Sequence, residues 1–292
     1  MRVEELRTLS VDTIPDAIGL MNESSRGTSS ECHMDFFSFL VFRGYWNISF
    51  AHSMICYVDG TAAAITLVCT DGTTPDAYIL YWGAIPRFRT LRIARSLFEA
   101  CCNKLSEDGY QMLYGLSVPD RAVKRYRFIQ ALPQFRLFDL RSEAPTVMPS
   151  DPAIRVQPID LDSVSSLSIP RDECIEWSQR LSFLRRVALS LKFFGAFAGD
   201  VLKAYAIIRP EPSGTATLID LRCSESDLAW GRALLDRGLI ERCPRPYVAT
   251  HVADQSYGYR LLTAAGFHVT RQIQVLTRDL RTTCSISPVR SL

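Results

Sequence analysis

Four arginines near a predicted strand-to-helix turn carry the strongest chemical signal in the sequence: Arg87, Arg89, Arg92 and Arg95. The first amides of a helix have no acceptor within the helix, and the helix dipole adds partial positive charge there. An anion such as a pyrophosphate is therefore favoured at this turn. A row of cations on a solvated helix face would need no ligand, and this simpler interpretation stays open.

The elements on either side of the turn should position it. Residues 76–85, DAYILYWGAI, are aromatic and aliphatic and carry no charge after Asp76, which is typical of a buried strand. Pro86 ends that strand because proline cannot donate to the ladder. From residue 91 onward apolar residues recur at helical spacing, so a helix is predicted from about 90 to 108.

At this turn the sequence resembles the GCN5-related N-acetyltransferases (GNATs). That family has the motif Arg/Gln-x-x-Gly-x-Gly/Ala here, and its backbone amides hold the pyrophosphate of acyl-coenzyme A. The hexad 89–94, RTLRIA, agrees at its first and last residues, whereas Arg92 replaces the first glycine. A side chain there would narrow the loop, although a guanidinium can itself contact phosphate. The resemblance implies acetyl-CoA, or another acyl-CoA, bound by Ala84, Ile85, Arg87, Arg89, Thr90, Leu91, Arg92, Ile93 and Ala94.

The resemblance also implies a catalytic acid. The family commonly uses a tyrosine after the fifth strand, in the pattern Asn-x-x-Ala-x-x-x-Tyr, to reprotonate the leaving thiolate. Ala122 and Tyr126 match that pattern without its asparagine, so Tyr126 is the implied acid, although core packing of its ring is equally open. In the family a Gly-Phe step follows within five residues, whereas here Phe135 lies nine residues away. Ser117, at the end of the preceding strand, could hold a water or align a substrate.

The general base is not identified by the sequence. Family members often carry a glutamate on the fourth strand, and none stands in the strand at residues 76–85. His33, His52 and His251 titrate in a useful range, but a lone histidine is more often a structural group. No metal-ligand spacing, G-x-S-x-G motif or P-loop occurs, which disfavours metal and covalent routes.

Two interpretations are open for the aromatic residues of this strand, Tyr78, Tyr81 and Trp82. Successive strand residues point to opposite faces of a sheet, so the row alternates between the two faces of one strand. Core packing explains the row at least as well as an acyl pocket does.

The first half of the chain has the element order of the family. Its predicted order is β, α, α, β, β, β, α, β, α, β, which belongs to an α/β fold with a mixed sheet. The clearest local signal is Asp59-Gly60, a hairpin turn between two apolar runs. The other predicted elements include a strand at 2–8, helices at about 13–22 and 34–46, a strand at 111–118, a helix at 120–132 and a strand at 134–142.

The second half repeats the first. Residues 142–153 carry three prolines and no periodicity, which predicts a linker between an N-terminal domain, 1–141, and a C-terminal domain, 154–292. We therefore expect two tandem GNAT-like domains, each a mixed, mostly antiparallel sheet flanked by helices. The second hexad, 226–231, keeps only its final Gly231, and Asp227 would repel a pyrophosphate. The first domain is thus the expected acyl-CoA site.

Composition narrows the function classes. Hydrophobic residues make up 47% of the 292 residues and the net charge is +2, which supports packed cores and gives no case for nucleic acid or an acidic membrane. No stretch is long and apolar enough for a bilayer span and no signal peptide is recognisable, so a cytoplasmic protein is expected. The nine cysteines include no Cys-x-x-Cys pair, which indicates reduced core thiols.

The resulting hypothesis is an acyl-CoA-dependent N-acyltransferase, acting on an amine of a small molecule or peptide. A catalytically inactive binding or regulatory protein of the same fold stays open, because both hexads depart from the motif. The family's aminoacyl-transfer relatives are disfavoured by the near-neutral charge. The acceptor, the acyl chain length and the oligomeric state are not indicated by the sequence.

Overall fold

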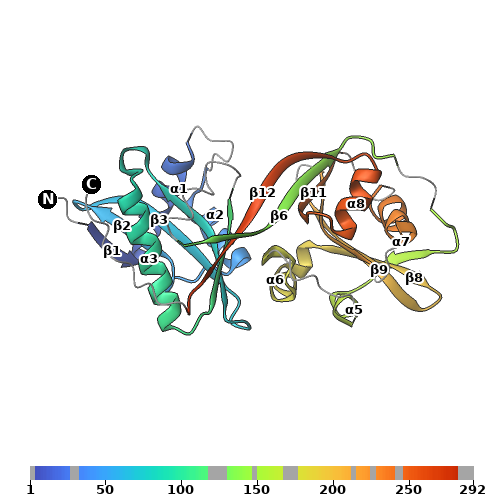
Figure 1. Ribbon diagram of the computed structural model, residues 1–292, viewed down its shortest axis with the longest axis horizontal. Helices are drawn as coiled ribbons and strands as arrows, with labels where there is room; N and C mark the ends of the chain where they lie inside the picture. The colour runs from blue at the N-terminus through green and yellow to red at the C-terminus, as the bar shows by residue number, and fades with distance from the viewer. Residues whose placement is uncertain are drawn as a thin grey trace. The chain divides into compact units, whose positions relative to one another are not determined.

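The computed structural model describes residues 4–26, 33–117, 130–146, 150–166, 177–211, 215–223, 228–240 and 246–281. These residues form two compact units, each a mixed sheet with helices packed against it (Figure 1). The first unit takes the chain up to residue 116 and the closing segment from 276, and the second takes mainly residues 134–275. The predicted fold class, a tandem α/β protein with mostly antiparallel sheets, is confirmed.

The sheet of the first unit has the strand order β1-β2-β3-β4-β5-β12, of which β12 contributes its last residues. From β1 to β5 all neighbouring pairs are antiparallel except β4–β5, which is parallel. Asp59 and Gly60 have φ of 49° and 75°, so the predicted hairpin turn is confirmed. The strands are β1 (Glu4–Thr8), β2 (Met54–Val58), β3 (Thr61–Thr70), β4 (Asp76–Ala84), β5 (Met112–Ser117) and β12 (His268–Asp279).

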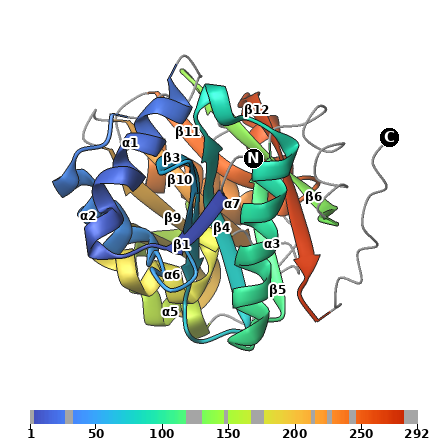
Figure 2. The same cartoon turned by 90° about the vertical axis from the view of Figure 1, so that its left-hand side faces the viewer.

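Helices cover both faces of this sheet. Figure 2 shows α1 (Ile14–Ser25) and α2 (Phe36–Trp46) beside one face and α3 (Leu91–Glu107) beside the opposite face. The apolar stripe of α3 predicted from its helical spacing is buried, with Leu97, Cys101 and Leu105 fully inaccessible. This packing fixes the first turn of α3 at the end of β4.

The sheet of the second unit has the order β12-β6-β11-β10-β9-β8-β7, and β10–β11 is its parallel counterpart of β4–β5. The strand predicted to close the first half is β6, which pairs with β11 in this unit. The division at 1–141, 142–153 and 154–292 stays a prediction about folding units. The strands are β6 (Leu132–Ser142), β7 (Arg155–Pro158), β8 (Lys192–Ala198), β9 (Val201–Pro210), β10 (Ala216–Cys223) and β11 (Tyr247–Ala253).

The second unit has cores on both faces of its sheet. One surrounds Leu234, Tyr247 and Leu262, and the other surrounds Leu184 and Ile207. Its helical segments are α5 (Leu161–Ser166), η3 (Trp177–Gln179), α6 (Leu181–Val187), η4 (Ala188–Ser190), α7 (Leu228–Ala233), the π-helical η5 (Leu234–Ile240) and α8 (Tyr257–Ala264).

Candidate ligand-binding site

The parallel strands β4 and β5 separate at their C-terminal ends. Their ladder ends at the pair Ile79 and Gly115, although both strands continue. At the same level β4 has a bulge, because Leu67 pairs with Tyr81 and Val68 with Ile79, which leaves Leu80 as the extra residue. The edge of β4 that faces β5 can therefore offer backbone N–H and C=O groups to a ligand.

A pocket of about 520 Å³, counting the space that opens to solvent, lies where the strands separate. Strand β4 lines it with Leu80, Tyr81 and Trp82, and β5 lines it with Tyr114 and Gly115. The remaining wall comes from α3, Ala131 and the end of β12. A pocket lined mainly by aliphatic and aromatic residues, between two strands that separate, suits an elongated ligand that carries amide groups.

The aromatic row of β4 divides between pocket and core. The Tyr81 hydroxyl lies 2.5 Å from Ser24 Oγ on α1, and the Trp82 ring packs at 5.2 Å on the Phe98 ring of α3. Tyr78 is buried instead and stacks on Trp46 of α2, with ring centroids 6.5 Å apart. Core packing therefore accounts for Tyr78, whereas Tyr81 and Trp82 line the pocket, and an acyl group in that pocket stays a prediction.

The turn after β4 leads directly into α3. A short 3₁₀ segment, η2 (Pro86–Phe88), follows the strand, and Thr90 then caps α3 by accepting a hydrogen bond at Oγ1 from the Ile93 N–H, at 3.3 Å. The next two amides, of Leu91 and Arg92, have no acceptor within the helix. Leu91 is 57% exposed, so this helix start is accessible to a ligand from solvent.

The arginines of the turn largely hold its own structure. Arg89 donates from Nε to the Ala84 carbonyl at 3.0 Å and from Nη2 to the Ser24 carbonyl at 2.9 Å, which ties the turn to β4 and α1. Arg92 pairs with Glu4 at 2.7 Å. In the same way Arg95 pairs with Glu99 at 2.6 Å, and Arg87 lies against the Phe88 ring at 4.9 Å. An anion would therefore meet the helix amides and the local positive charge rather than four uncommitted cations.

The structure describes one of the two predicted catalytic residues. Ser117 is buried at the end of β5, with 6% of its surface exposed. Tyr126, with the helix predicted at 120–132, lies outside the described residues. The described part of the pocket wall contains no carboxylate and no histidine, so it adds no candidate for the general base.

His52 belongs to a structural contact, as the simpler interpretation of a lone histidine predicts. Its Nδ1 lies 2.7 Å from Ser49 Oγ and its Nε2 lies 2.9 Å from Asp108 Oδ2, which joins the segment before β2 to the end of α3. Lys104 pairs with the same carboxylate at 3.1 Å. Hydrogen bonds from Lys104 and then from His52 lower the pKa of Asp108 below its usual value.

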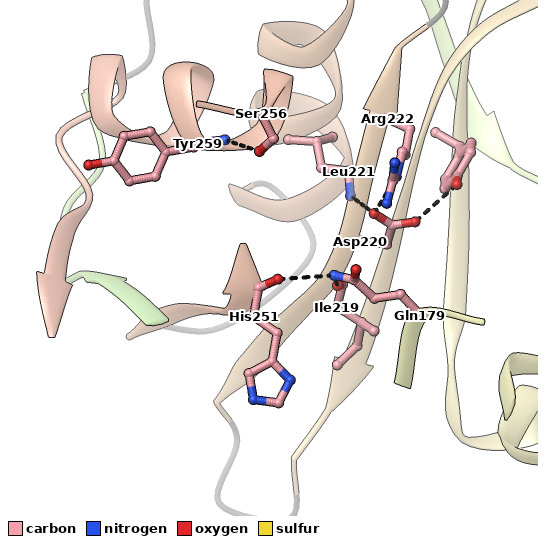
Figure 3. A network of polar contacts seen from close by, with 9 residues as sticks. Gln179, Ile219, Asp220, Leu221, Arg222, His251, Ser256 and Tyr259 are labelled. Carbon is pink, nitrogen blue, oxygen red and sulfur yellow. Dashed lines mark hydrogen bonds and ion pairs between the residues drawn. The ribbon is translucent and has the colours of Figure 1, made fainter. Parts of the chain in front are cut away.

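In the second unit the corresponding gap, between β10 and β11, is closed by the side chain of Gln179. The β10–β11 ladder ends at Leu218 and Ala249, and Ile219 is the bulged residue of β10. Gln179, only 6% exposed, donates from Nε2 to the Ile219 carbonyl at 2.9 Å and to the His251 carbonyl at 3.4 Å (Figure 3). One carboxamide thereby joins both separated strands and satisfies their backbone acceptors.

His251 lies at a bulge of β11, which explains its unusual backbone. It has φ of 56°, and it and Thr250 together oppose the single residue Asp139 of β6. Its N–H donates to Asp139 Oδ1 at 3.0 Å, and its carbonyl accepts from Gln179. The backbone of His251 is therefore occupied by protein contacts.

A buried ion pair follows the bulge of β10. Asp220 Oδ1 accepts hydrogen bonds from the Leu221 N–H and from Arg222 Nε, both at 3.0 Å (Figure 3). Its Oδ2 accepts a third from the Tyr205 hydroxyl, also at 3.0 Å. Asp220 is the only carboxylate that β4 or β10 carries after its bulge. Its hydrogen bonds make it a structural group.

The second hexad is only partly visible. Ser226 and Asp227 lie outside the described residues, so the repulsion expected from Asp227 stays a prediction. Gly231 donates its N–H to the Tyr257 hydroxyl at 3.0 Å, and a Cβ at Gly231 would lie 2.4 Å from Leu261 Cδ2. The glycine that resembles the motif is thus required by the close approach of α8 to α7.

Other site classes find little support in the described part of the chain. Its His, Cys, Asp and Glu side chains form no group of three or more that could hold a metal ion. None of its helices has the length and apolar character needed to cross a membrane. None of its five cysteines forms a disulfide and four of them are buried, and burial raises the pKa of Cys56 to about 11.

Comparison with solved structures identifies the fold. The tandem GNAT protein of the clavulanic acid biosynthesis pathway superposes with a TM-score of 0.63 at 13% identity, over 95% of this chain and 99% of that one. The GCN5-related N-acetyltransferase of Sphaerobacter thermophilus gives 0.65 at 12%, over 95% and 96%. That of Anabaena variabilis gives 0.66 at 12%, over 95% and 73%. No family model and no curated protein matches the sequence. The chain therefore has the tandem GNAT fold.

Proposed function

We propose that this protein is an acyl-CoA-dependent N-acyltransferase, and that its first unit binds acetyl-CoA or another acyl-CoA. The acyl group would pass directly to an amine of a small molecule or peptide. The observation that carries this proposal is the pocket between β4 and β5. Strand β4 lines this pocket and then leads into the exposed start of helix α3. A cytoplasmic location is proposed with it.

The residues of the first unit fit such a cosubstrate. The amides of Leu91 and Arg92, at the positive end of the α3 dipole, suit a pyrophosphate. The edge of β4 beyond its ladder with β5 suits the amide groups of a pantetheine arm. The aliphatic and aromatic residues that line the pocket suit a short acyl chain. Arg89 would act by holding the turn in place, since it bonds the Ala84 and Ser24 carbonyls.

Bound acyl-CoA would supply an acyl group activated as a thioester. The amine nitrogen forms the new bond to the carbonyl carbon, the C–S bond breaks, and the amine loses a proton while the thiolate gains one. In this proposal a backbone N–H of β4 polarises the carbonyl, Tyr126 returns the proton to sulfur, and Ser117 holds a water or the substrate. Holding both reactants in one pocket contributes the remaining rate enhancement.

The described residues of the second unit fill the corresponding places with protein contacts, which supports a structural role for this unit. Gln179 occupies the gap between its parallel strands, and the Gly231 amide is bonded to Tyr257. Five residues before Phe267, where the family pattern places its tyrosine, stands the fully buried Leu262. A leucine has no proton to donate.

A non-catalytic GNAT-fold binding protein is the second candidate. It is favoured by Arg92, which stands where the family has glycine and already pairs with a carboxylate, that of Glu4. It is also favoured by the lack of a carboxylate or histidine in the described pocket wall. Turnover that is lost in Tyr126→Phe while acyl-CoA binding persists would support the enzyme over this alternative.

Calorimetric titration with acetyl-CoA tests the proposal directly. A Leu91→Glu substitution places a negative charge at the helix start, where it favours α3 but repels an anionic ligand. We expect wild type to bind one equivalent, Leu91→Glu to bind at least about tenfold more weakly, and the neutral control Leu91→Gln to resemble wild type. Absence of binding to wild type with every acyl-CoA tried would overturn the proposal.

A further inference from the structure

The sheet of the first unit ends in an exposed edge strand. Among the strands that the structure describes, β1 has β2 as its only neighbour, at one end of the strand order (Figure 1). Four of its five residues are exposed. An edge strand presents backbone N–H and C=O groups with which a strand of another chain can pair. The outer side of β1 is therefore a candidate interaction surface.

The register of β1 on β2 identifies the backbone groups that face outward. The N–H of Leu9, which directly follows β1, donates to the Ser53 carbonyl at 2.7 Å. In an antiparallel pair, hydrogen-bonded and non-hydrogen-bonded positions alternate. Counted from Leu9, every second residue of β1 therefore points its backbone groups toward β2, and the residues between them point theirs outward. Leu6, at the centre of β1 and 39% exposed, is one of the outward residues.

The charges of β1 are complementary to a second copy of the same strand. If two β1 strands pair in antiparallel fashion about a central Leu6 pair, Glu5 of each copy lies opposite Arg7 of the other. These flanking positions are non-hydrogen-bonded pairs, where side chains come closest, and opposite charges placed there stabilise the pairing. Glu5 and Arg7 are 52% and 53% exposed and bond each other at 2.7 and 2.8 Å within one copy. A carboxylate has acceptor sites for more than one donor, so it can keep this pair and add a second.

The other edge strand, β7, is protected against such pairing. The Ile159 N–H donates to the Phe193 carbonyl at 3.0 Å, so the same alternation makes Pro158 an outward residue. Proline has no N–H to offer there, which is a common protection of sheet edges. β1 contains no proline. Because each copy would use the same edge, an assembly through β1 closes at two copies.

We infer that β1 is the docking surface for a second copy of this chain, and that two copies join the sheets of their first units in an antiparallel β1–β1 pair centred on Leu6. The inference does not depend on the proposed function, because no ligand takes part in it. Glu4 does not oppose the pairing, since its carboxylate pairs with Arg92 at 2.7 Å within the same copy. An edge of five residues is a small interface, which suits a weak dimer that depends on concentration.

Sedimentation velocity of the full chain, over a range of concentrations, tests the inference with two charge reversals. We expect wild type to dimerise with a Kd on the order of 10 µM. Glu5→Arg places cations at both flanking positions, and Arg7→Glu places carboxylates at both. Each variant alone should dimerise at least about tenfold more weakly, because like charges then lie opposite each other. A one-to-one mixture of the two variants should associate about as well as wild type, since opposite charges again face each other.

Two further variants separate the edge from its charges. Arg141→Glu is the matched control, because Arg141 pairs at 2.6 Å with the exposed Glu143 two residues later, on β6, which has a strand on each side. It should dimerise like wild type. Leu6→Pro removes an outward N–H and leaves the ladder with β2 in place, as Pro158 does in β7, so it should abolish the dimer. Circular dichroism and thermal melting verify that each variant is folded.

Three results would overturn the inference. One is a wild type that stays monomeric up to about 100 µM, or that grows into larger assemblies without stopping at two copies. Another is a dimer that both single charge reversals leave unchanged, because it would use a different face. The third is loss of the dimer in both reversals without recovery in their mixture, because the charges would then act within one copy rather than between two.

Discussion

The two parallel strand pairs of this protein, β4–β5 and β10–β11, have the same topology, but the gap between the separated strands differs. In both, the ladder stops before the strands end, at Ile79 and Gly115 in one and at Leu218 and Ala249 in the other. In the first unit the gap is a pocket, whereas in the second the Gln179 carboxamide bonds the carbonyls of both strands. The fold creates the gap, and the side chains around it decide whether a ligand can use it.

The two helix starts differ in the same way. In the first unit α3 begins at an exposed turn and continues as a regular helix from Leu91 to Glu107. In the second, α7 has six residues, its Gly231 amide is bonded to Tyr257, and the chain continues in π-helical form. A glycine in the motif position therefore indicates close helix packing here, and an arginine in the motif position does not remove the accessible amides.

The largest expected effect comes from separating the halves at the predicted linker. A fragment of residues 1–141 lacks the closing segment of the first unit, in which the Leu280 N–H donates to the Gln111 carbonyl at 2.8 Å and the Leu280 carbonyl accepts from Ser106 Oγ at 3.1 Å. It also leaves β6 without β11. We expect this fragment to be insoluble or to unfold without cooperativity, as measured by circular dichroism and thermal melting.

Co-expression with residues 154–292 provides the control for that fragment, because it restores both missing strands. A fragment 1–141 that melts cooperatively on its own would show instead that the first half is a self-sufficient domain. The strand gaps of the two units could then be compared on isolated domains.

The next largest effect is expected from Gly231→Ala. The added Cβ would lie 2.4 Å from Leu261 Cδ2 and 2.7 Å from the Tyr257 hydroxyl, so these packed side chains of α8 must shift. We expect a loss of about 1–3 kcal/mol in the free energy of unfolding, measured by denaturant titration. Gly19→Ala on α1 is the control, since its Cβ would meet nothing within 4 Å and a helical alanine should be neutral or up to about 1 kcal/mol stabilising.

Gln179→Met tests whether the carboxamide closes the second gap. The substitution keeps the volume but removes the donors, so the Ile219 and His251 carbonyls lose their shared partner. We expect the free energy of unfolding to fall by about 1–3 kcal/mol, with acetyl-CoA affinity unchanged. Gln274→Met, which removes a bond to the Phe135 carbonyl in a less buried place, should cost less. An unchanged stability would contradict the role assigned to Gln179.

The smallest effect concerns the far end of α3. The pKa of Asp108 is lowered by Lys104 and His52, so its charged form is stabilised in the folded state. A lowered pKa contributes stability above the ordinary value of 3.8 and loses it as the pH falls through the folded-state pKa. Asp108→Asn should therefore lower Tm slightly at pH 7, and the difference from wild type should shrink as the pH falls below 3.8 and through the lowered folded-state pKa.

Glu107→Gln is the matched control for that change, because it removes a neighbouring carboxylate at the end of the same helix. Its Tm relative to wild type should vary less with pH. A difference for Asp108→Asn that stays constant from pH 7 to pH 3 would indicate a purely steric effect.

Much of the fold could be predicted because its signals are local. The Asp59-Gly60 turn and the buried stripe of α3 follow from short-range patterns, and the structure confirms both. The described elements of the first half also occur in the predicted order, whereas the helix predicted at 120–132 lies outside the described residues. The pairing of β6 with β11 could not be predicted, since any strand of suitable length can join either sheet. The amino-acid sequence of β6 does not indicate which strand it pairs with.

The site could be predicted at the level of the turn but not of its side chains. The sequence places Arg89 at a phosphate loop, and only the structure shows that it bonds two backbone carbonyls. The role of Gln179 could not be predicted, because it is far in sequence from the strands that it contacts. A buried glutamine has no local pattern that reveals its burial.

The central claim is that acyl-CoA uses the first gap and not the second. Amide hydrogen exchange, followed by mass spectrometry with and without acetyl-CoA, reports on both regions at once. The account predicts increased protection in peptides covering 79–98, with those covering 217–223 and 228–235 unchanged. Protection confined to the second set, or to neither, would contradict it.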